Sequence, residues 1–176
     1  MRKLFLSMLM MLAFSSVAFA YSPENEADAR KAIDAIKEIR YNVEAGVNLV
    51  NYNTVVSKAG VEYRRYADKY PDGSPDTYPS SSLKDMLNPY VRAGEIWHNA
   101  VYEDPRYYGI NKAFTTEKMA TLFSEYPVLK TRLKTYPDAA GTQVYWYEDI
   151  IRALWAMAAE QEKILNIKPK NPEQPQ

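Results

Sequence analysis

The amino-acid sequence predicts an all-α fold, an antiparallel helical bundle of about four main helices whose N-terminal helix is long. Apolar side chains recur at steps of three, four or seven through most of the chain, which is the spacing of one side of a helix. The sequence contains no convincing strand pair and no long internal repeat. It also contains no cysteine, so apolar packing, without disulfide bonds, must hold this fold together.

The first helix is expected to begin at Ser22, which can cap it, with Pro23 at the first helical position and Glu24 in the first turn. The residues that follow include an apolar seam that a helix would present on one side. The seam consists of Ile36, Val43, Val47, Val50, Thr54, Ser57 and Val61.

The length of this first helix has two interpretations. Residues 23–70 contain no internal proline, so a continuous helix would form a rod of roughly 70 Å, at about 1.5 Å per residue. Gly46, Gly60 and a cluster of asparagines weaken the middle of this run. A break near residues 51–54 is therefore the alternative.

Residues 70–82 are expected to form a loop, because they contain three prolines, a glycine and three consecutive serines. A second helix follows, and Pro89 should kink it or split it after its first turn. The seam of this helix consists of Leu83, Leu87, Tyr90, Gly94, Trp97 and Val101. The chain is then expected to turn at residues 107–109.

The last third of the chain predicts two more helices. Thr115 or Thr116 can cap a short helix, which Pro127 interrupts, and residues 128–133 continue as a separate turn. The short helix holds Met119, Leu122 and Phe123. The last helix carries one seam that consists of Val144, Tyr147, Ile151, Leu154, Ala158, Gln161 and Leu165.

Residues 1–20 have the order of a cleaved export signal. Two basic residues precede an apolar run that is too short for a stable membrane anchor, and small residues stand at Ala18 and Ala20. We therefore expect cleavage between Ala20 and Tyr21 and a periplasmic or secreted protein. Residues 21–167 are expected to form a single helical domain, and the proline-rich tail at 168–176 is expected to be disordered.

The charge and composition of the chain exclude several classes of protein. The chain has 22 basic and 22 acidic groups, and removal of the signal takes away Arg2 and Lys3. A chain so close to neutrality is not expected to bind nucleic acid or anionic lipid as its main partner. The absence of cysteine excludes covalently attached haem, iron–sulfur ligation and a thiol nucleophile. We expect no cofactor and no membrane span in the mature chain.

Two stretches resemble a group of uncharacterised, exported bacterial helical-bundle proteins. Residues 43–48 and Tyr52 are similar to a vGvnYxxY-like pattern in the opening helix of that group, with Leu49 where its first tyrosine would stand. The stretch from Tyr90 to Trp97 is similar to its YxxAGxxW-like element. The resemblance implies export and a helical fold, and it carries over no activity and no catalytic residue.

The aromatic residues beyond the signal are 15 tyrosines and three tryptophans against only two phenylalanines. Aromatic side chains with a polar tip suit half-exposed positions such as bundle rims, clefts and interfaces. They either fill the boundary of a slim bundle or line a surface for a ligand or a partner. The candidate binding residues are Tyr52, Tyr90, Trp97, His98, Trp146, Tyr147 and Trp155. Gly94 would admit either a ligand or a neighbouring helix.

Metal-binding and catalytic patterns are sparse. His98 is the only histidine, and it belongs to no zinc motif. Residues 72–76 place oxygen atoms at calcium-loop positions, but the glycine and the final acidic residue of an EF-hand are missing, so a capped turn is the better interpretation. Ser80, Ser81 and Ser82 lie in no nucleophile motif, and Glu148 and Asp149 diverge on a helix. We therefore predict no metal site and no catalytic residue.

Two functions remain from different classes. The first is a non-enzymatic exported module that binds another envelope protein, forms a homo-oligomer or helps assembly through its tyrosine-rich side. The second is a periplasmic protein that binds a small ligand in an aromatic-lined pocket between helices, with tryptophans as stacking walls. An enzyme that uses carboxylates across the bundle is a third and weaker hypothesis.

Overall fold

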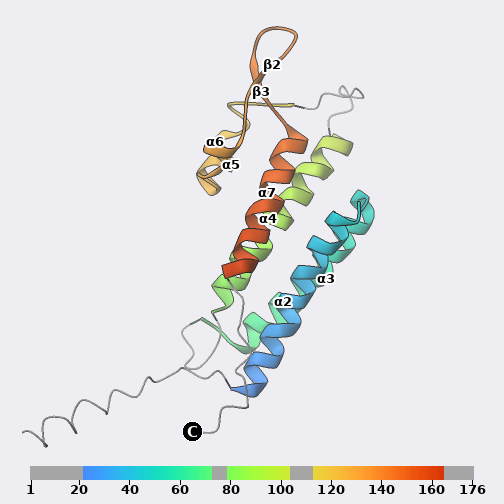
Figure 1. Ribbon diagram of the computed structural model, residues 1–176, viewed down its shortest axis with the longest axis vertical. Coiled ribbons are helices and arrows are strands. Elements are labelled where there is room, and N and C mark those ends of the chain that lie inside the picture. The colour runs from blue at the N-terminus through green and yellow to red at the C-terminus, as the bar shows by residue number, and fades with distance from the viewer. Residues whose placement is uncertain (1–21, 73–78, 104–112, 165–176) are drawn as a thin grey trace, which may run out of the picture.

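The computed structural model describes residues 22–72, 79–103 and 113–164, and these residues are mostly helical, as predicted. The expected signal, the turn at 107–109 and the tail at 168–176 lie outside the described residues. Four long helices pack alongside one another in the described part (Figure 1). These are α2 (Pro23–Glu44), α3 (Leu49–Lys69), α4 (Ser80–His98) and α7 (Tyr147–Ile164).

The prediction of one helix through residues 23–70 is wrong, because the chain reverses at residues 45–48 and forms a helical hairpin. Gly46 has a φ of 84° after the end of α2. The N–H of Gly46 donates to the carbonyl of Val43 at 3.1 Å, and the N–H of Val47 donates to that of Asn42 at 3.1 Å. This pair of bonds is a Schellman motif, which closes the carbonyl end of a helix.

The next helix begins directly after this turn. The Asn48 side chain accepts a hydrogen bond from the N–H of Asn51 at 2.9 Å, which caps α3. The predicted alternative, a break near residues 51–54, is therefore also wrong. Asn51 belongs to the first turn of α3, and the asparagine cluster starts a helix instead of interrupting one.

The start of α4 is closed by a residue from the preceding loop. Asp72 accepts hydrogen bonds from Ser80 Oγ at 2.9 Å and from the N–H of Ser81 at 3.2 Å, and these bonds lower the pKa of its carboxyl. Asp72 therefore supplies the cap that Pro79 cannot provide. The other residues of the expected calcium-type loop, 73–76, lie outside the described part. Pro89 is buried within α4, which continues through it, so the predicted split does not occur.

A small sheet corrects the prediction that the fold has no strands. It contains β1 (Ala113–Thr115), β2 (Tyr136–Pro137) and β3 (Gln143–Trp146) in the order β1-β3-β2, and both pairings are antiparallel. The prediction failed because each strand has at most four residues. Residues 144–146 also pair with residues 113–115, which are distant in sequence. Such short segments carry too little alternation to be recognised.

The segment between the strands follows the prediction more closely. Met119, Leu122 and Phe123 are buried at or within α5 (Ala120–Glu125), and Pro127 separates α5 from the short α6 (Leu129–Arg132). A short π-helix, η1 (Asn99–Glu103), extends the end of α4. The last helix begins later than predicted, at Tyr147, because residues 143–146 form β3.

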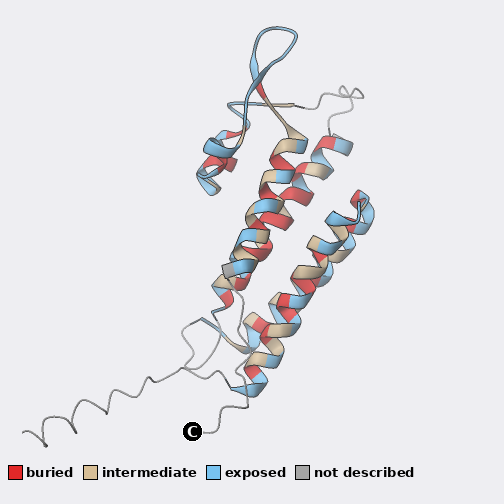
Figure 2. Cartoon of the chain, in the orientation of Figure 1, coloured by how far each residue is buried: buried red, intermediate tan, exposed pale blue. Residues whose placement is uncertain are grey.

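The buried residues, red in Figure 2, form one main cluster that takes in the four long helices and also α5 and α6. An ion pair joins α2 to α7 beside this cluster. The Arg40 guanidinium donates two hydrogen bonds to Glu162, at 2.9 and 3.1 Å. Near the start of α2, a buried side-chain bond of 3.0 Å runs from Asn25 Nδ2 to Tyr66 Oη and joins α2 to α3. Polar contacts therefore fix how the apolar faces meet.

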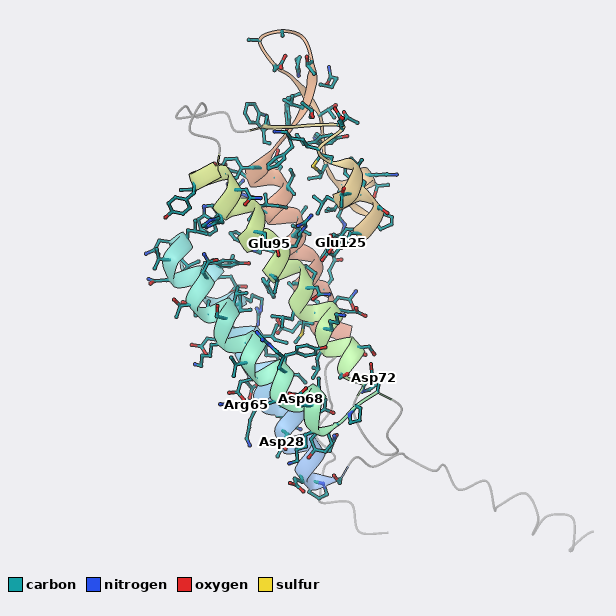
Figure 3. The ribbon with its side chains drawn as sticks, turned by 180° about the vertical axis from the view of Figure 1, so that it is seen from behind. Asp28, Arg65, Asp68, Asp72, Glu95 and Glu125 are labelled. Carbon is teal, nitrogen blue, oxygen red and sulfur yellow. The ribbon has the colours of Figure 1, made fainter. Side chains whose placement is uncertain are left out.

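Ion pairs join the start of α2 to the end of α3. Lys69 Nζ lies 2.7 Å from a carboxylate oxygen of Asp28 and 2.7 Å from one of Glu24, and Lys31 also contacts Asp28 at 3.0 Å. Figure 3 shows Asp28 at the same end of the hairpin as Arg65. The hydrogen bond from Lys69, followed by that from Lys31, lowers the pKa of Asp28 from 3.8 to about 2.

We expect Gly46→Ala to destabilise the protein by about 1 kcal/mol, because an alanine at a φ of 84° occupies the left-handed region. No atom crowds a Cβ at this position, so backbone strain is the only cost. Urea unfolding measures the change. Gly60→Ala, inside α3, is the matched control, and it should stabilise the protein by about 0.5–1 kcal/mol. Equal effects of the two substitutions would contradict the assigned turn.

We expect the free energy of unfolding to depend less on pH in acid after the substitution Asp28→Asn. A carboxyl whose folded pKa is depressed stabilises the fold above its unfolded pKa of about 3.9, and this contribution disappears as the pH falls through about 2. The free energy of unfolding should therefore change less in the variant than in the wild type between about pH 4 and 2. Urea unfolding at several pH values tests this. Asp34→Asn is the control, because Asp34 makes no ion pair with another described residue, and an equal effect of both substitutions would refute the expectation.

Candidate functional site

Tyr52 of α3 is fully buried and joins three helices at the centre of the candidate aromatic site. Its hydroxyl donates a hydrogen bond of 2.7 Å to the carbonyl of Tyr90 on α4 and accepts one of 3.0 Å from the indole N–H of Trp155 on α7. Its ring centroid lies 5.6 Å from that of Trp97 and 5.8 Å from that of Trp155. The tyrosine and the two indoles therefore form one hydrogen-bonded aromatic cluster.

Gly94 allows Tyr52 to reach this position. A Cβ at residue 94 would lie 3.1 Å from Cε1 of Tyr52 and 3.3 Å from Oδ1 of Asn53. The small residue therefore serves the close approach of α3 to α4. Of the two predicted roles for Gly94, admission of a neighbouring helix is the one that the structure supports.

Burial keeps the phenols of this region neutral. Desolvation is the largest cause that raises the pKa of both Tyr52 and Tyr90 far above the usual value. The indole N–H of Trp155 acts in the opposite direction on Tyr52, but it does not overcome burial. The Tyr52 hydroxyl therefore remains a hydrogen-bond donor near neutral pH, and it is not available as a base or a nucleophile.

A small groove opens on the solvent side of the aromatic cluster. It has a volume of about 190 Å³, and the rings of Trp97, Tyr147 and Trp155 line it with Glu148, Ile151 and Arg152. Sites for drug-sized ligands usually measure about 300–1,000 Å³. The groove is smaller than this range, and the ligand-binding alternative stays a prediction.

His98 and Trp146 lie apart from this cluster. His98 is exposed near the end of α4, and its ring centroid lies 4.8 Å from that of Tyr102. Trp146 falls within the segment predicted as the last helix, from Val144 to Leu165, but it ends β3 instead, and its ring centroid lies 6.1 Å from that of Tyr136. The structure thus brings together Tyr52, Tyr90, Trp97, Tyr147 and Trp155, and it leaves out the other two predicted residues.

The outer side of α3 is the surface that the sequence analysis missed. Val50 and Val61 are 67% and 44% exposed, and Thr54 and Ser57 between them are also exposed. We call these four residues the α3 stripe. The predicted seam assigned them to the same side as Ile36, which is buried in α2.

The true inner side of α3 follows a different spacing. Tyr52, Ala59 and Tyr66 recur at every seventh residue and are buried. At 3.6 residues per turn, Val61 and Thr54 lie roughly 180–200° around the helix from Tyr52. The seven-residue spacing was visible in the sequence, but two of its three members are tyrosines, and the valines looked more apolar.

A second groove borders the α3 stripe. It lies between α3 and α4 and has a volume of about 470 Å³. Its lining residues are Asn53, Val56, Ser57, Val91, Gly94, Glu95, His98 and Asn99. It is a shallow, mostly uncharged channel beside an exposed helix face, and within the described ranges no cluster of three or more histidine, aspartate or glutamate side chains is suited to hold a metal ion.

We expect Tyr52→Phe to lower the free energy of unfolding by about 1–3 kcal/mol. The substitution removes both hydrogen bonds of the hydroxyl and leaves the indole N–H of Trp155 without its acceptor. Urea unfolding of the two proteins measures the loss. Tyr41→Phe is the control, because Tyr41 is 54% exposed and its loss of a hydroxyl should change little. A Tyr52 variant as stable as this control would refute the role of the hydroxyl.

None of the helices in residues 22–72, 79–103 and 113–164 is both long and apolar enough to cross a membrane. The resemblance to exported helical-bundle proteins stays a prediction. Comparisons of the chain with protein-family models, with curated proteins and with solved structures found no match.

Proposed function

We propose that this chain is an exported, non-enzymatic helical module that binds another protein, or helps to assemble one, in the bacterial envelope. In this proposal residues 1–20 direct export, and the mature protein is periplasmic or secreted from Tyr21 onward. The four long helices act as one antiparallel bundle that presents the outer side of α3. The resemblance of residues 43–52 and 90–97 to exported helical proteins agrees with this proposal.

The observation that carries the proposal is the uncharged, exposed α3 stripe. Residues 49–57 contain no charged side chain, although the outer side of a helix in water usually carries several. The cores of protein interfaces are depleted in charged residues, because charged groups are costly to desolvate. Val50 and its neighbours can therefore be covered by a partner at a small desolvation cost.

The aromatic residues support a structural role more than a ligand site. The rings of Tyr52, Trp97 and Trp155 pack against one another, with centroid distances of 5.6, 5.8 and 6.0 Å, and the Tyr52 hydroxyl already accepts the indole N–H of Trp155. The remaining groove of about 190 Å³ is smaller than a usual ligand site. The rings that the sequence nominated as stacking walls thus stabilise the helices that present the α3 stripe.

Site-specific photo-crosslinking in the native host tests the proposal. A photoreactive residue at Thr54 should give a discrete protein adduct in the envelope, and Val50→Glu should abolish it. The matched control is the same residue at Ala156, which is exposed on α7 and lies outside the stripe.

The recovered protein must begin at Tyr21, which checks the export step. An adduct of equal yield from both positions, or none from Thr54, would contradict the proposal, and so would an uncleaved protein in the cytoplasm.

A further inference from the structure

The α3 stripe continues along the helix with the spacing of a coiled-coil seam. Val50, Thr54, Ser57 and Val61 are followed by Arg64 and Asp68, so the steps alternate between four and three residues. All six side chains are exposed. Steps of this kind align side chains along one face, and in coiled coils that face meets a second helix.

We propose that the partner of this face is a second copy of the chain, with the two α3 helices packed antiparallel about a two-fold axis. This inference rests on the proposed function and names its partner. An isologous pair brings the same surface of both copies together, so the stripe has to be complementary to itself. The valines of the stripe and the charges of Arg64 and Asp68, which follow it on α3, meet this requirement in one orientation only.

The valines and hydroxyls of the stripe pair in an antiparallel register. When Val50 of one copy lies opposite Val61 of the other, Thr54 lies opposite Ser57, and symmetry repeats both contacts. The apolar contacts then stand at the two ends of the interface, and the small hydroxyl side chains meet at its centre. Antiparallel coiled coils pair the two kinds of seam position in this way.

The charged residues that follow the stripe, Arg64 and Asp68, favour this orientation over the parallel one. In a parallel pair, Arg64 would face Arg64 of the other copy and Asp68 would face Asp68, which is repulsive. In the antiparallel register, Arg64 comes to the start of the other copy's α3, next to the turn that follows Glu44. The Glu44 side chain already pairs with Arg40 of its own chain at 3.2 Å but is 58% exposed, and Arg64 makes no ion pair with another described residue.

Small side chains around the stripe permit a close approach. Thr54 and Ser57 lie at the centre of the stripe, and Ser57 also lines the groove of about 470 Å³ between α3 and α4. Val50 and Val61 of the second copy can therefore pack close to this groove. The four short side chains of the stripe would bury less surface area than a standard interface, which buries about 800 Å² per partner. We therefore expect a dissociation constant on the order of 10–100 μM.

Sedimentation equilibrium of the mature protein over a wide concentration range tests the association. Val61→Glu should weaken the dimer at least about tenfold, because it places two charges in the interface. Val128→Glu is the matched control, since Val128 is 39% exposed but precedes α6, away from α3. Circular dichroism confirms that both variants are folded, and Ser57→Lys gives a second test at the centre of the stripe. Equal dissociation constants for the Val61 and Val128 variants would overturn the proposal.

The orientation is tested by a distance between spin labels. The chain has no cysteine, so Arg65→Cys provides a single labelling site on each copy. Arg65 is 70% exposed and lies beside the stripe. The antiparallel register separates the two labels by about 28 Å along the helix axes, at about 1.5 Å per residue. A parallel pair would hold them about 10 Å apart, close to the interaxial distance, and a short distance would overturn the proposed orientation.

The outcomes separate this inference from the proposed function. A concentration-dependent dimer with the long label distance supports the inference. A protein that stays monomeric at the highest concentration, while Thr54 still cross-links to a different envelope protein, overturns the self-association and leaves the proposed function standing. A monomer with no cross-link from Thr54 overturns both.

Discussion

The structure depends above all on the burial of the Tyr52 hydroxyl between three helices. A buried hydroxyl without partners is costly, so Tyr52 can be inside only where α4 offers a carbonyl and α7 offers an indole N–H. Gly94 supplies the space for its ring. This one side chain therefore fixes the distance between α3 and α4 and the rotation of α3 about its own axis.

The rotation of α3 links the core to the proposed function. Once Tyr52, Ala59 and Tyr66 face inward, the opposite side of the helix must face outward, and that side carries Val50 and Val61. In the proposed function, the aromatic residues do not contact the partner themselves. They fix the orientation of α3 so that the stripe faces solvent, where a partner can bind it. Ion pairs between α2 and α3, such as that of Lys58 with Glu38, complete the hairpin without adding charge to the first half of the stripe.

The sequence predicts the helices well and their orientation poorly. Periodicity and Pro127 located α5, α6 and most of α7, because these signals are local. The sequence predicted the break between the first two helices a few residues too late. The local signal for the real turn is only a single glycine, Gly46, shortly before the capping residue Asn48. The strands and the place of Trp146 depend on pairing with residues 113–115, which no local pattern reveals. The inner side of α3 was missed because the burial of a tyrosine depends on hydrogen-bond partners from other helices.

A double-mutant cycle at Tyr52 and Trp155 tests the central claim most directly. The two single substitutions to phenylalanine and the double substitution are compared by their free energies of unfolding in urea. If the hydroxyl and the indole N–H depend on each other, the two effects will be non-additive by at least about 1 kcal/mol. Additive effects would show that the bond does not hold α3 to α7, and the assigned outward orientation of the stripe would then lose its physical basis.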